Sequence, residues 1–84
     1  MTRQDICSRL RELMKKSSPR QVDWNAYTEQ SGIAGLGFDS LSVLDLIYDV
    51  QQAFDLEFDA EELTGIETVG DLVTFIDGKL SAKG

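Results

Sequence analysis

The stretch LGFDSLSVLDLI, residues 36–47, joins a glycine-containing segment to a strongly apolar one. Gly37 lies within it, and the pair Asp39-Ser40 stands where the apolar residues begin. Asp39 suits the N-cap position of a helix, because its carboxylate can accept hydrogen bonds from free backbone N–H groups of the first turn. We therefore expect a helix over roughly residues 40–54, with Ser40 in its first turn.

Helical geometry divides this segment into two faces. At about 100° per residue, one set of apolar side chains falls on a single stripe and is expected to face the core. The stripe comprises Val43, Leu46, Ile47, Val50 and Phe54, with Leu44 at its edge. Leu41 and Tyr48 fall on another flank, beside carboxylates such as Asp45 and Asp49. This mixed flank is expected of a binding face, although Leu41 and Tyr48 could instead widen the core stripe.

The rest of the chain also reads as helical, and no segment reads as a strand. Apolar residues recur at helical spacing over residues 3–16, and TVGD at residues 68–71 opens a last helix that carries apolar residues as far as Leu80. DAEE at residues 59–62 matches a capping-box pattern for a very short helix. The sequence therefore predicts an all-α fold. It is a small four-helix bundle with three longer helices, one short third helix, and a long loop between the first and second helices.

The long loop covers residues 17–38 and has an apolar content that is unusual for a connection. Loops of this length are uncommon unless they are functional or internally packed. Its large apolar side chains are Val22, Trp24, Tyr27, Ile33, Leu36 and Phe38. We therefore expect part of the loop to fold back onto the core.

Length and composition are those of an ordinary globular protein. With 84 residues, of which 42% are hydrophobic and 27% charged, we expect one domain over residues 1–84. No apolar run approaches the ~20 residues of a membrane-spanning helix. The N-terminal stretch MTRQDICSRL lacks the uninterrupted apolar core of a signal peptide, so we expect a cytoplasmic protein with no membrane insertion. Cys7 is the only cysteine, so it cannot form an internal disulfide, and we predict that it is a small buried apolar residue.

The net charge of −7 is spread unevenly along the chain. Six of the eight basic residues fall in the first twenty residues, and none lies between Gln21 and Gly78. Thirteen Asp and Glu residues occupy that same stretch. Such a surface repels nucleic acid and anionic membranes and attracts basic protein patches, although acidity can also serve solubility alone. We expect protein partners and no nucleic acid.

The residues needed for several kinds of catalysis are missing. The chain has no histidine, which excludes Ser-His-Asp and Cys-His arrangements. GLGFDS lacks the Gly-Lys-Ser/Thr ending of a Walker loop, and Ser40 lacks the flanking glycines of a nucleophile elbow. The acidic run that starts at Asp55 has Ala60 and Ile66 where an EF-hand loop needs Gly and Glu. We expect no catalytic residue and no metal site.

Ser40 remains the residue best placed for chemistry. In the first turn of a helix, free N–H groups and the positive end of the helix dipole favour a phosphate group. A phosphodiester on the serine oxygen would be accommodated there. An ordinary serine at a helix start would occupy the same position, so position alone does not decide between the two.

The segment GFDSL at residues 37–41, followed by an apolar helix, resembles the attachment motif of acyl carrier proteins of the free-standing type. The similarity covers roughly residues 3–80 and includes the long loop, the short acidic third helix and the last helix opening with Thr-Val. The resemblance implies that a phosphopantetheinyl transferase moves 4'-phosphopantetheine from coenzyme A onto the Ser40 hydroxyl. The thiol of this arm would carry acyl intermediates as thioesters. It also implies a monomer that performs no catalysis and shuttles its cargo between enzymes.

The resemblance further implies roles for two groups of side chains. Family members shelter the acyl chain in a cleft between the second and third helices. The candidates for the lining of this cleft are Leu44, Ile47, Phe58, Leu63 and Ile66. Acyl-transferring and condensing enzymes with basic docking patches recognise the flank of the second helix. The residues carried over to this recognition face are Leu41, Asp45, Tyr48 and Ile66.

The motif does not choose the pathway. Gln51 and Gln52 stand where fatty-acid carriers often have Glu, and GFDSL also resembles carriers of polyketide or other specialised pathways. A peptidyl carrier is a close relative, but it usually has Gly-Gly before a variable residue and the serine. The alternative from a different class is an unmodified acidic helical adaptor that only docks onto a protein partner.

Overall fold

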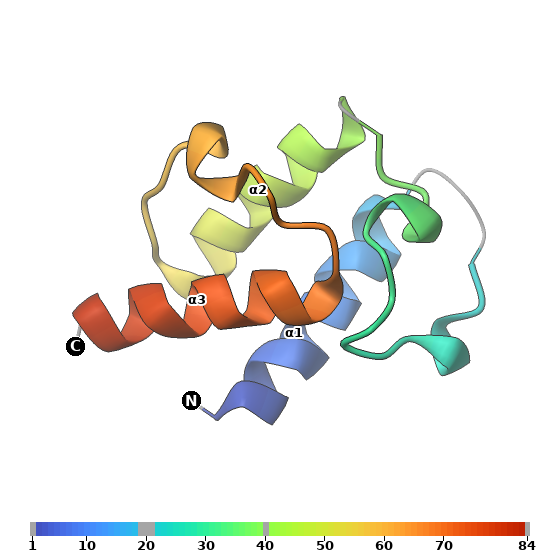
Figure 1. Ribbon diagram of the computed structural model, residues 1–84, viewed down its shortest axis with the longest axis horizontal. Coiled ribbons are helices and arrows are strands. Elements are labelled where there is room, and N and C mark those ends of the chain that lie inside the picture. Colours follow the sequence, from blue (N-terminus) through green and yellow to red (C-terminus); the bar gives the residue numbers. More distant parts are fainter. Residues whose placement is uncertain (1, 19–21, 40, 84) are drawn as a thin grey trace.

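Helices dominate the part of the chain that the structure describes. The structure is a computed structural model and describes residues 2–18, 22–39 and 41–83. Within these ranges the chain forms three α-helices and three short 3₁₀ turns, with no strand beyond an isolated bridge between Gly32 and Thr68. In chain order the elements are α1 (Arg3–Ser17), η1 (Trp24–Ala26), η2 (Ala34–Leu36), α2 (Ser42–Phe54), η3 (Ala60–Leu63) and α3 (Val69–Lys83) (Figure 1). The predicted all-α class is confirmed.

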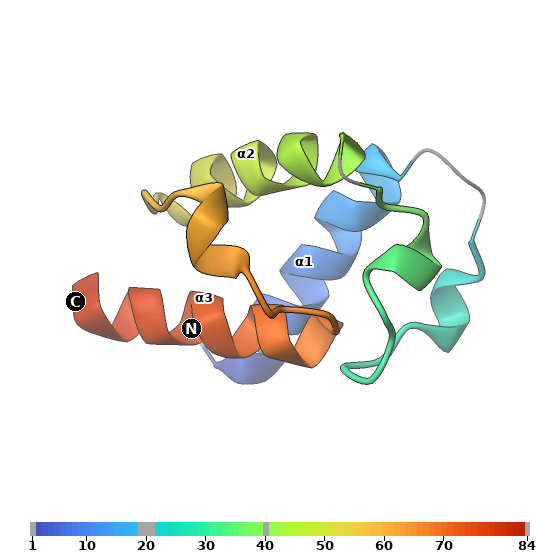
Figure 2. The ribbon, with the colours of Figure 1, turned by 45° about the horizontal axis from the view of Figure 1, so that its top comes forward.

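The three α-helices share one apolar core. Helix α1 packs against both α2 and α3. Figure 2 shows α2 and α3 on opposite sides of the molecule, with η3 between them. The helical side chains buried in this core are Ile6, Leu10, Met14, Leu46, Ile47, Val50, Phe54, Val69, Leu72, Val73 and Ile76. The predicted core stripe of the second helix is therefore correct, and Val43 at its margin is partly buried.

Helices α1 and α3 both start with a reciprocal pair of hydrogen bonds. In α1 the Asp5 N–H donates to Thr2 Oγ1 and the Thr2 N–H donates to Asp5 Oδ2, both at 3.1 Å. In α3 the Asp71 N–H donates to Thr68 Oγ1 at 3.1 Å, and the Thr68 N–H returns to Asp71 Oδ2 at 3.3 Å. These bonds satisfy N–H groups that have no partner within the helix. The Thr-Val opening of the last helix is thus a capping sequence.

The long loop folds back onto the core, as expected from its apolar content. Leu36 and Phe38 are buried. The other apolar loop residues are partly buried and pack against the same core; they are Val22, Trp24, Tyr27 and Ile33. Cys7 is half-buried rather than fully buried, with Sγ 3.7 Å from Tyr27 Oη. Tyr27 Oη donates to the Cys7 carbonyl at 3.0 Å, and burial raises the pKa of this phenol.

Three backbone hydrogen bonds tie the loop to the start of α3, and we call them the loop–α3 tie. They run from Ile33 N to Glu67 O (2.9 Å), from Val69 N to Ser31 O (2.9 Å) and from Gly70 N to Glu29 O (2.7 Å). The approach at the last contact is close, because a Cβ on the glycine would lie 3.0 Å from the Glu29 carbonyl oxygen. Glycine is the residue that leaves room for this contact.

Arg3 reinforces the tie from the start of α1. Its Nε donates to Glu29 Oε1 at 2.9 Å, and its Nη1 donates to Thr74 Oγ1 at 2.8 Å. Its Nη2 also donates to the Gly70 carbonyl at 3.1 Å. One guanidinium group therefore joins α1, the loop and α3.

The expected short third helix forms as a 3₁₀ turn, so the four-helix description holds only in part. Turn η3 has four residues, a length for which i→i+3 hydrogen bonds are common. Glu62 closes its start as the capping pattern predicts, because its Oε2 accepts the Asp59 N–H at 2.9 Å. Gly65 follows with a φ of 91°, which prevents continuation as a helix. Glu62 Oε1 also accepts from Lys79 Nζ of α3 at 2.7 Å.

Candidate functional site

The loop before α2 is anchored immediately ahead of the predicted attachment serine. Leu36 and Phe38 are buried on either side of Gly37, whose φ of 99° lies in the left-handed region that favours glycine. Ser40 itself lies outside the described residues. Its two neighbours, Asp39 and Leu41, are both exposed. The chain therefore passes from the buried side chain of Phe38 to the exposed side chain of Asp39.

Asp39 caps the start of α2. Its Oδ1 accepts the N–H groups of Leu41 (2.9 Å) and Ser42 (2.8 Å), and also the Ser42 hydroxyl at 3.0 Å. Ser42 Oγ in turn accepts the Asp39 N–H at 2.9 Å. Hydrogen bonds from the backbone N–H and hydroxyl of Ser42, followed by the Leu41 N–H, lower the pKa of Asp39. The regular helix begins at Ser42 rather than at residue 40, but the predicted capping chemistry is present.

This capping corrects one expectation about a phosphate on Ser40. The N–H groups of Leu41 and Ser42 are bonded to the Asp39 carboxylate, and the Val43 N–H donates to the Asp39 carbonyl at 3.0 Å. The Leu44 N–H donates to Leu41 O at 3.2 Å. The sequence suggests that N–H groups at this helix start are free to hold a phosphate. In the structure, however, all four of these N–H groups already have an acceptor. The exposed helix start and its positive dipole remain compatible with a phosphate.

Asp39→Ala should lower the melting temperature by several degrees, because two N–H groups of α2 lose their acceptor. Asp39→Asn keeps an acceptor oxygen and should stay close to wild type at neutral pH. The pKa of Asp39 in the folded chain is below its ordinary value of 3.8, so its contribution is present above that value and is lost as the pH falls through the folded pKa. Thermal unfolding at several pH values measures this. A gap between wild type and Asp39→Ala that does not narrow in acid would contradict the charged cap.

One flank of α2 exposes apolar side chains to solvent. Leu41, Leu44 and Tyr48 are 76%, 50% and 63% exposed, and Asp45 is exposed between them. The alternative in which Leu41 and Tyr48 widen the core stripe is therefore wrong. Asp49 does not belong to this flank alone, because its Oδ2 accepts the Ser17 hydroxyl of α1 at 2.7 Å. Large exposed apolar groups next to a carboxylate are unusual on a surface that contacts only water.

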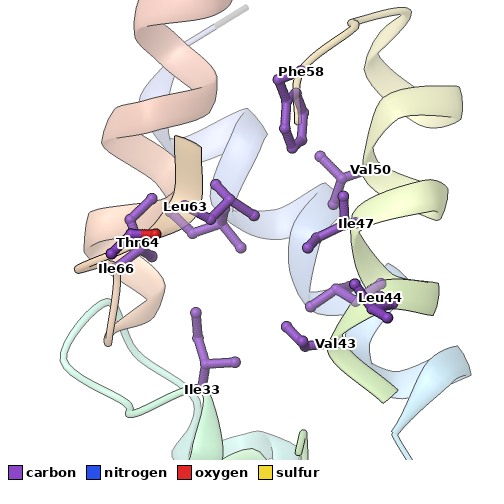
Figure 3. A pocket seen from close by; sticks show the side chains of 11 residues that line it. Ile33, Val43, Leu44, Ile47, Val50, Phe58, Leu63, Thr64 and Ile66 are labelled. Carbon is purple, nitrogen blue, oxygen red and sulfur yellow. The ribbon is translucent and has the colours of Figure 1, made fainter. Parts of the chain in front are cut away.

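An apolar cavity of about 260 Å³ lies between α2 and the segment that carries η3. Figure 3 shows side chains of α2 on one side of it, facing Leu63, Thr64 and Ile66 on the other. Its lining comprises Ile33, Val43, Leu44, Leu46, Ile47, Val50, Phe58, Leu63, Thr64, Ile66 and Leu72. All five residues predicted for an acyl cleft are among them.

The sequence missed six residues of this lining. Val43, Leu46 and Val50 could have been found, because they lie on the same apolar stripe of α2 as Ile47. Ile33 could not, because it comes from the long loop and reaches the cavity through the loop–α3 tie. The other two are Thr64 and Leu72. Ile66, predicted for both the cleft and the docking face, is partly buried in the cavity wall.

The described residues form neither a metal-binding cluster nor a membrane-spanning helix. No group of three or more Cys, Asp or Glu side chains in residues 2–18, 22–39 and 41–83 is arranged to hold a metal ion. Over the same ranges, no helix has the length and apolar character needed to cross a membrane.

Residues 4–76 match the protein family described as "Phosphopantetheine attachment site". The chain belongs to this family, and within it to the acyl carrier proteins. It is 36% identical over 80 residues to the acyl carrier protein of Thermotoga maritima, covering 94% of this chain and 96% of that protein. It is 29% identical over 84 residues to acyl carrier protein 3 of Ralstonia nicotianae, covering all of this chain and 95% of that protein.

The fold agrees with this assignment. Superposition on the crystal structure of an acyl carrier protein from Thermotoga maritima gives a TM-score of 0.76 with 27% identity, covering 98% of this chain and 94% of that one. The chain is thus an acyl carrier with phosphopantetheine as its cofactor, and its relatives are carriers rather than catalysts.

Proposed function

We propose that Ser40 carries the 4'-phosphopantetheine arm and that α2 organises both the loading and the protection of the cargo. The observation that carries the proposal is the position of the Asp39-Ser40-Leu41 motif. Asp39 and Leu41, the neighbours of Ser40 in the sequence, are exposed at the start of the same helix that lines the apolar cavity. When attached, the arm supplies a terminal thiol on which an acyl group travels as a thioester.

The cavity is the proposed shelter for that acyl group. Leu44 and Ile47 of α2 face Leu63 and Ile66 across it, and Phe58 lies at one end (Figure 3). Contact with these side chains removes apolar surface of the cargo from water, which favours the sheltered state. Leu44 is half exposed, so it lies on both the cavity and the outer flank of the helix.

The exposed flank of α2 is the proposed docking surface. Leu41 and Tyr48 offer apolar contact area, Asp45 offers a negative charge, and Ile66 contributes from the cavity wall. The proposed partners are a phosphopantetheinyl transferase and acyl-transferring and condensing enzymes with basic docking patches. A charge of −7 with no basic residue between Gln21 and Gly78 supports such partners, because it attracts positively charged surfaces.

The same proposal includes a single carrier domain over residues 1–84 that works as a monomer in the cytoplasm. The core supports one domain, because all three α-helices and the long loop contribute to one buried cluster.

The first test is the intact mass of the wild-type protein after incubation with coenzyme A and a broad-specificity transferase. We expect one arm to be added per chain. An unchanged mass would favour the alternative, an unmodified acidic adaptor that only docks onto a partner.

Asp45→Lys should slow loading by the transferase about three- to tenfold at low salt without unfolding the domain. Charges at the edge of an interface mainly steer the encounter of the two proteins, so the loss should shrink as salt rises. Transferase kinetics at two salt concentrations measure this. Glu12→Lys makes the same charge change on an exposed position of α1 and serves as the control. Equal slowing in both variants would mean that net charge alone steers the encounter.

Tyr48→Ala should weaken docking by roughly tenfold, and the loss should persist at high salt. The substitution removes apolar contact area, and burial of a large apolar side chain is worth roughly 1.5–3 kcal/mol. Because Tyr48 is 63% exposed, the melting temperature of the Tyr48→Ala variant should stay close to that of wild type. Transferase KM at low and high salt separates this effect from that of Asp45. Unfolding of the variant would assign Tyr48 to the core instead.

A further inference from the structure

One flank of α1 borders α2 and carries positive charge. Ser17 Oγ donates to Asp49 Oδ2 of α2 at 2.7 Å, and this contact shows which side of α1 meets α2. On the same side, Arg9 Nη1 donates to the Ala53 carbonyl of α2 at 3.2 Å. Lys16 follows Arg9 by seven residues, which places it within about 20° of Arg9 around the helix axis. Lys16 is exposed and forms no ion pair with another described residue, so its charge is available to a docked protein.

The opposite side of α2 borders an acidic segment. Residues 55–67, which include η3, contain six carboxylates and no basic residue. Glu57 and Glu61 are among its exposed side chains. The segment is held beside α2 by Gln51, whose Oε1 accepts the Phe58 N–H at 3.3 Å, and Figure 1 shows α2 between η3 and α1. The exposed apolar side chains of α2 therefore have a basic border on the α1 side and an acidic border on the η3 side.

Asp45 lies between the exposed apolar side chains of α2 and the basic border. It precedes Asp49 by four residues and so lies about 40° from it around α2, and Asp49 contacts Ser17 of α1. A basic patch that covers Asp45 therefore comes next to Lys16. Like charges that face each other across an interface repel, whereas an acidic side chain at the same place would be attracted.

An interface of standard size extends beyond α2. Such an interface buries about 800 Å² and 20–30 residues on each partner. Helix α2 has 13 residues, and four of them are buried in the core. A partner that covers the exposed flank of α2 must therefore also cover the end of α1 on one side and residues 55–67 on the other.

We propose that Lys16 is a docking residue, and that an enzyme docked on α2 places an acidic side chain opposite it, next to the basic patch that meets Asp45. This inference rests on the proposed function, because the enzymes concerned are those that load and unload Ser40. The opposite charges on the two sides of α2 also fix which way round the enzyme sits. The reversed placement would set its acidic side chain against Glu57 and Glu61.

Lys16→Glu should slow loading by the transferase about three- to tenfold at low salt, and the loss should shrink as salt rises. The direction of the change is diagnostic. The substitution makes the chain more acidic, and net charge alone would speed its encounter with a basic patch. Transferase kinetics at two salt concentrations measure the effect. Loading of Lys16→Glu at the wild-type rate or faster would overturn the proposal.

Lys15→Glu is the matched control. Lys15 is also exposed, makes the same change in net charge, and lies about 100° from Lys16, on the side of α1 turned away from α2. Both lysines belong to the last turn of α1, so both substitutions lose the same favourable interaction with the helix dipole. Lys15→Glu should load at least as fast as wild type. Equal slowing of the two variants would overturn the proposal.

Cross-linking identifies the contact directly. A carbodiimide joins an amine to a carboxylate that touches it. In a mixture of the Ser40→Ala protein and the transferase, it should join Lys16, and not Lys15, to an Asp or Glu of the transferase. Changing that transferase residue to Lys should restore loading of the Lys16→Glu chain. Absence of the Lys16 cross-link, an equal yield at Lys15, or no restoration would overturn the proposal.

Binding measured without the arm separates this inference from the proposed function. In the Ser40→Ala background, Lys16→Glu should raise the Kd for the transferase about three- to tenfold at low salt, whereas Lys15→Glu should not raise it. If wild type gains no arm but this difference in Kd is present, Ser40 loses its proposed role and the docking role of Lys16 stands. If the arm attaches and the two Kd values are equal, the docking role of Lys16 is wrong.

Discussion

Ser40→Ala should abolish attachment of the phosphopantetheine arm completely, because it removes the hydroxyl oxygen to which the phosphate would be linked. The intact mass after incubation with coenzyme A and a transferase should remain that of the unmodified chain. The fold should persist, since the Asp39 carboxylate that caps α2 is retained and its contacts are to Leu41 and Ser42. A melting temperature close to that of wild type checks this.

Two other serines, Ser42 in the cap of α2 and Ser31 in the long loop, provide matched controls. Ser42 uses its hydroxyl in the cap with Asp39, and Ser31 Oγ accepts the Thr28 N–H at 3.0 Å. Ser42→Ala and Ser31→Ala should still gain one arm, although Ser42→Ala will be less stable. An arm found on Ser40→Ala, or lost from either control, would move the attachment site to another residue.

Leu46→Ala should destabilise the domain by roughly 2–5 kcal/mol, whereas Leu44→Ala should change its stability by less than about 0.5 kcal/mol. The two leucines lie two positions apart on α2, yet Leu46 is fully buried and Leu44 is 50% exposed. Truncation of Leu46 leaves a void in the core. Truncation of Leu44 opens space that water can fill.

The destabilisation expected for Leu46→Ala is a substantial fraction of the total free energy of unfolding, which is roughly 4–13 kcal/mol for a domain of this size. Urea unfolding of the two variants and wild type gives both values. Equal destabilisation by the two truncations would mean that the outer flank of α2 packs against the core, which would also remove it as a docking surface.

The parts of the fold that depend on local periodicity could be predicted from the sequence. The buried stripe of α2 follows from spacing alone, and so does the capping chemistry of Asp39, because both involve residues within one or two turns of each other. The pathway-independent part of the assignment, a carrier of the acyl carrier protein family, also came from a short motif and its place in the chain.

The features that could not be predicted depend either on contacts between segments distant in the sequence or on competition between acceptors for the same N–H groups within one turn. Ile33 joins the cavity only because the loop–α3 tie brings it there, and nothing in its neighbourhood indicates this. The helical wheel places Asp49 beside the exposed flank of α2, whereas in the structure its Oδ2 also accepts the Ser17 hydroxyl of α1. The N–H groups expected to be free for a phosphate were already bonded to Asp39, a competition that counting donors from sequence does not reveal.

The loop–α3 tie has a consequence for the order of folding. The α-helices consist of local contacts, which form quickly, whereas the tie joins Glu29 and Ser31 to residues that follow η3, far along the chain. We expect these hydrogen bonds to appear after the transition state, so that substitutions at Gly70 or Arg3 mainly accelerate unfolding and leave the refolding rate nearly unchanged. A chain still emerging from the ribosome, with α1 and α2 synthesised but Glu67 not yet free, could not form the tie, so the loop before Asp39 would not yet be held to α3.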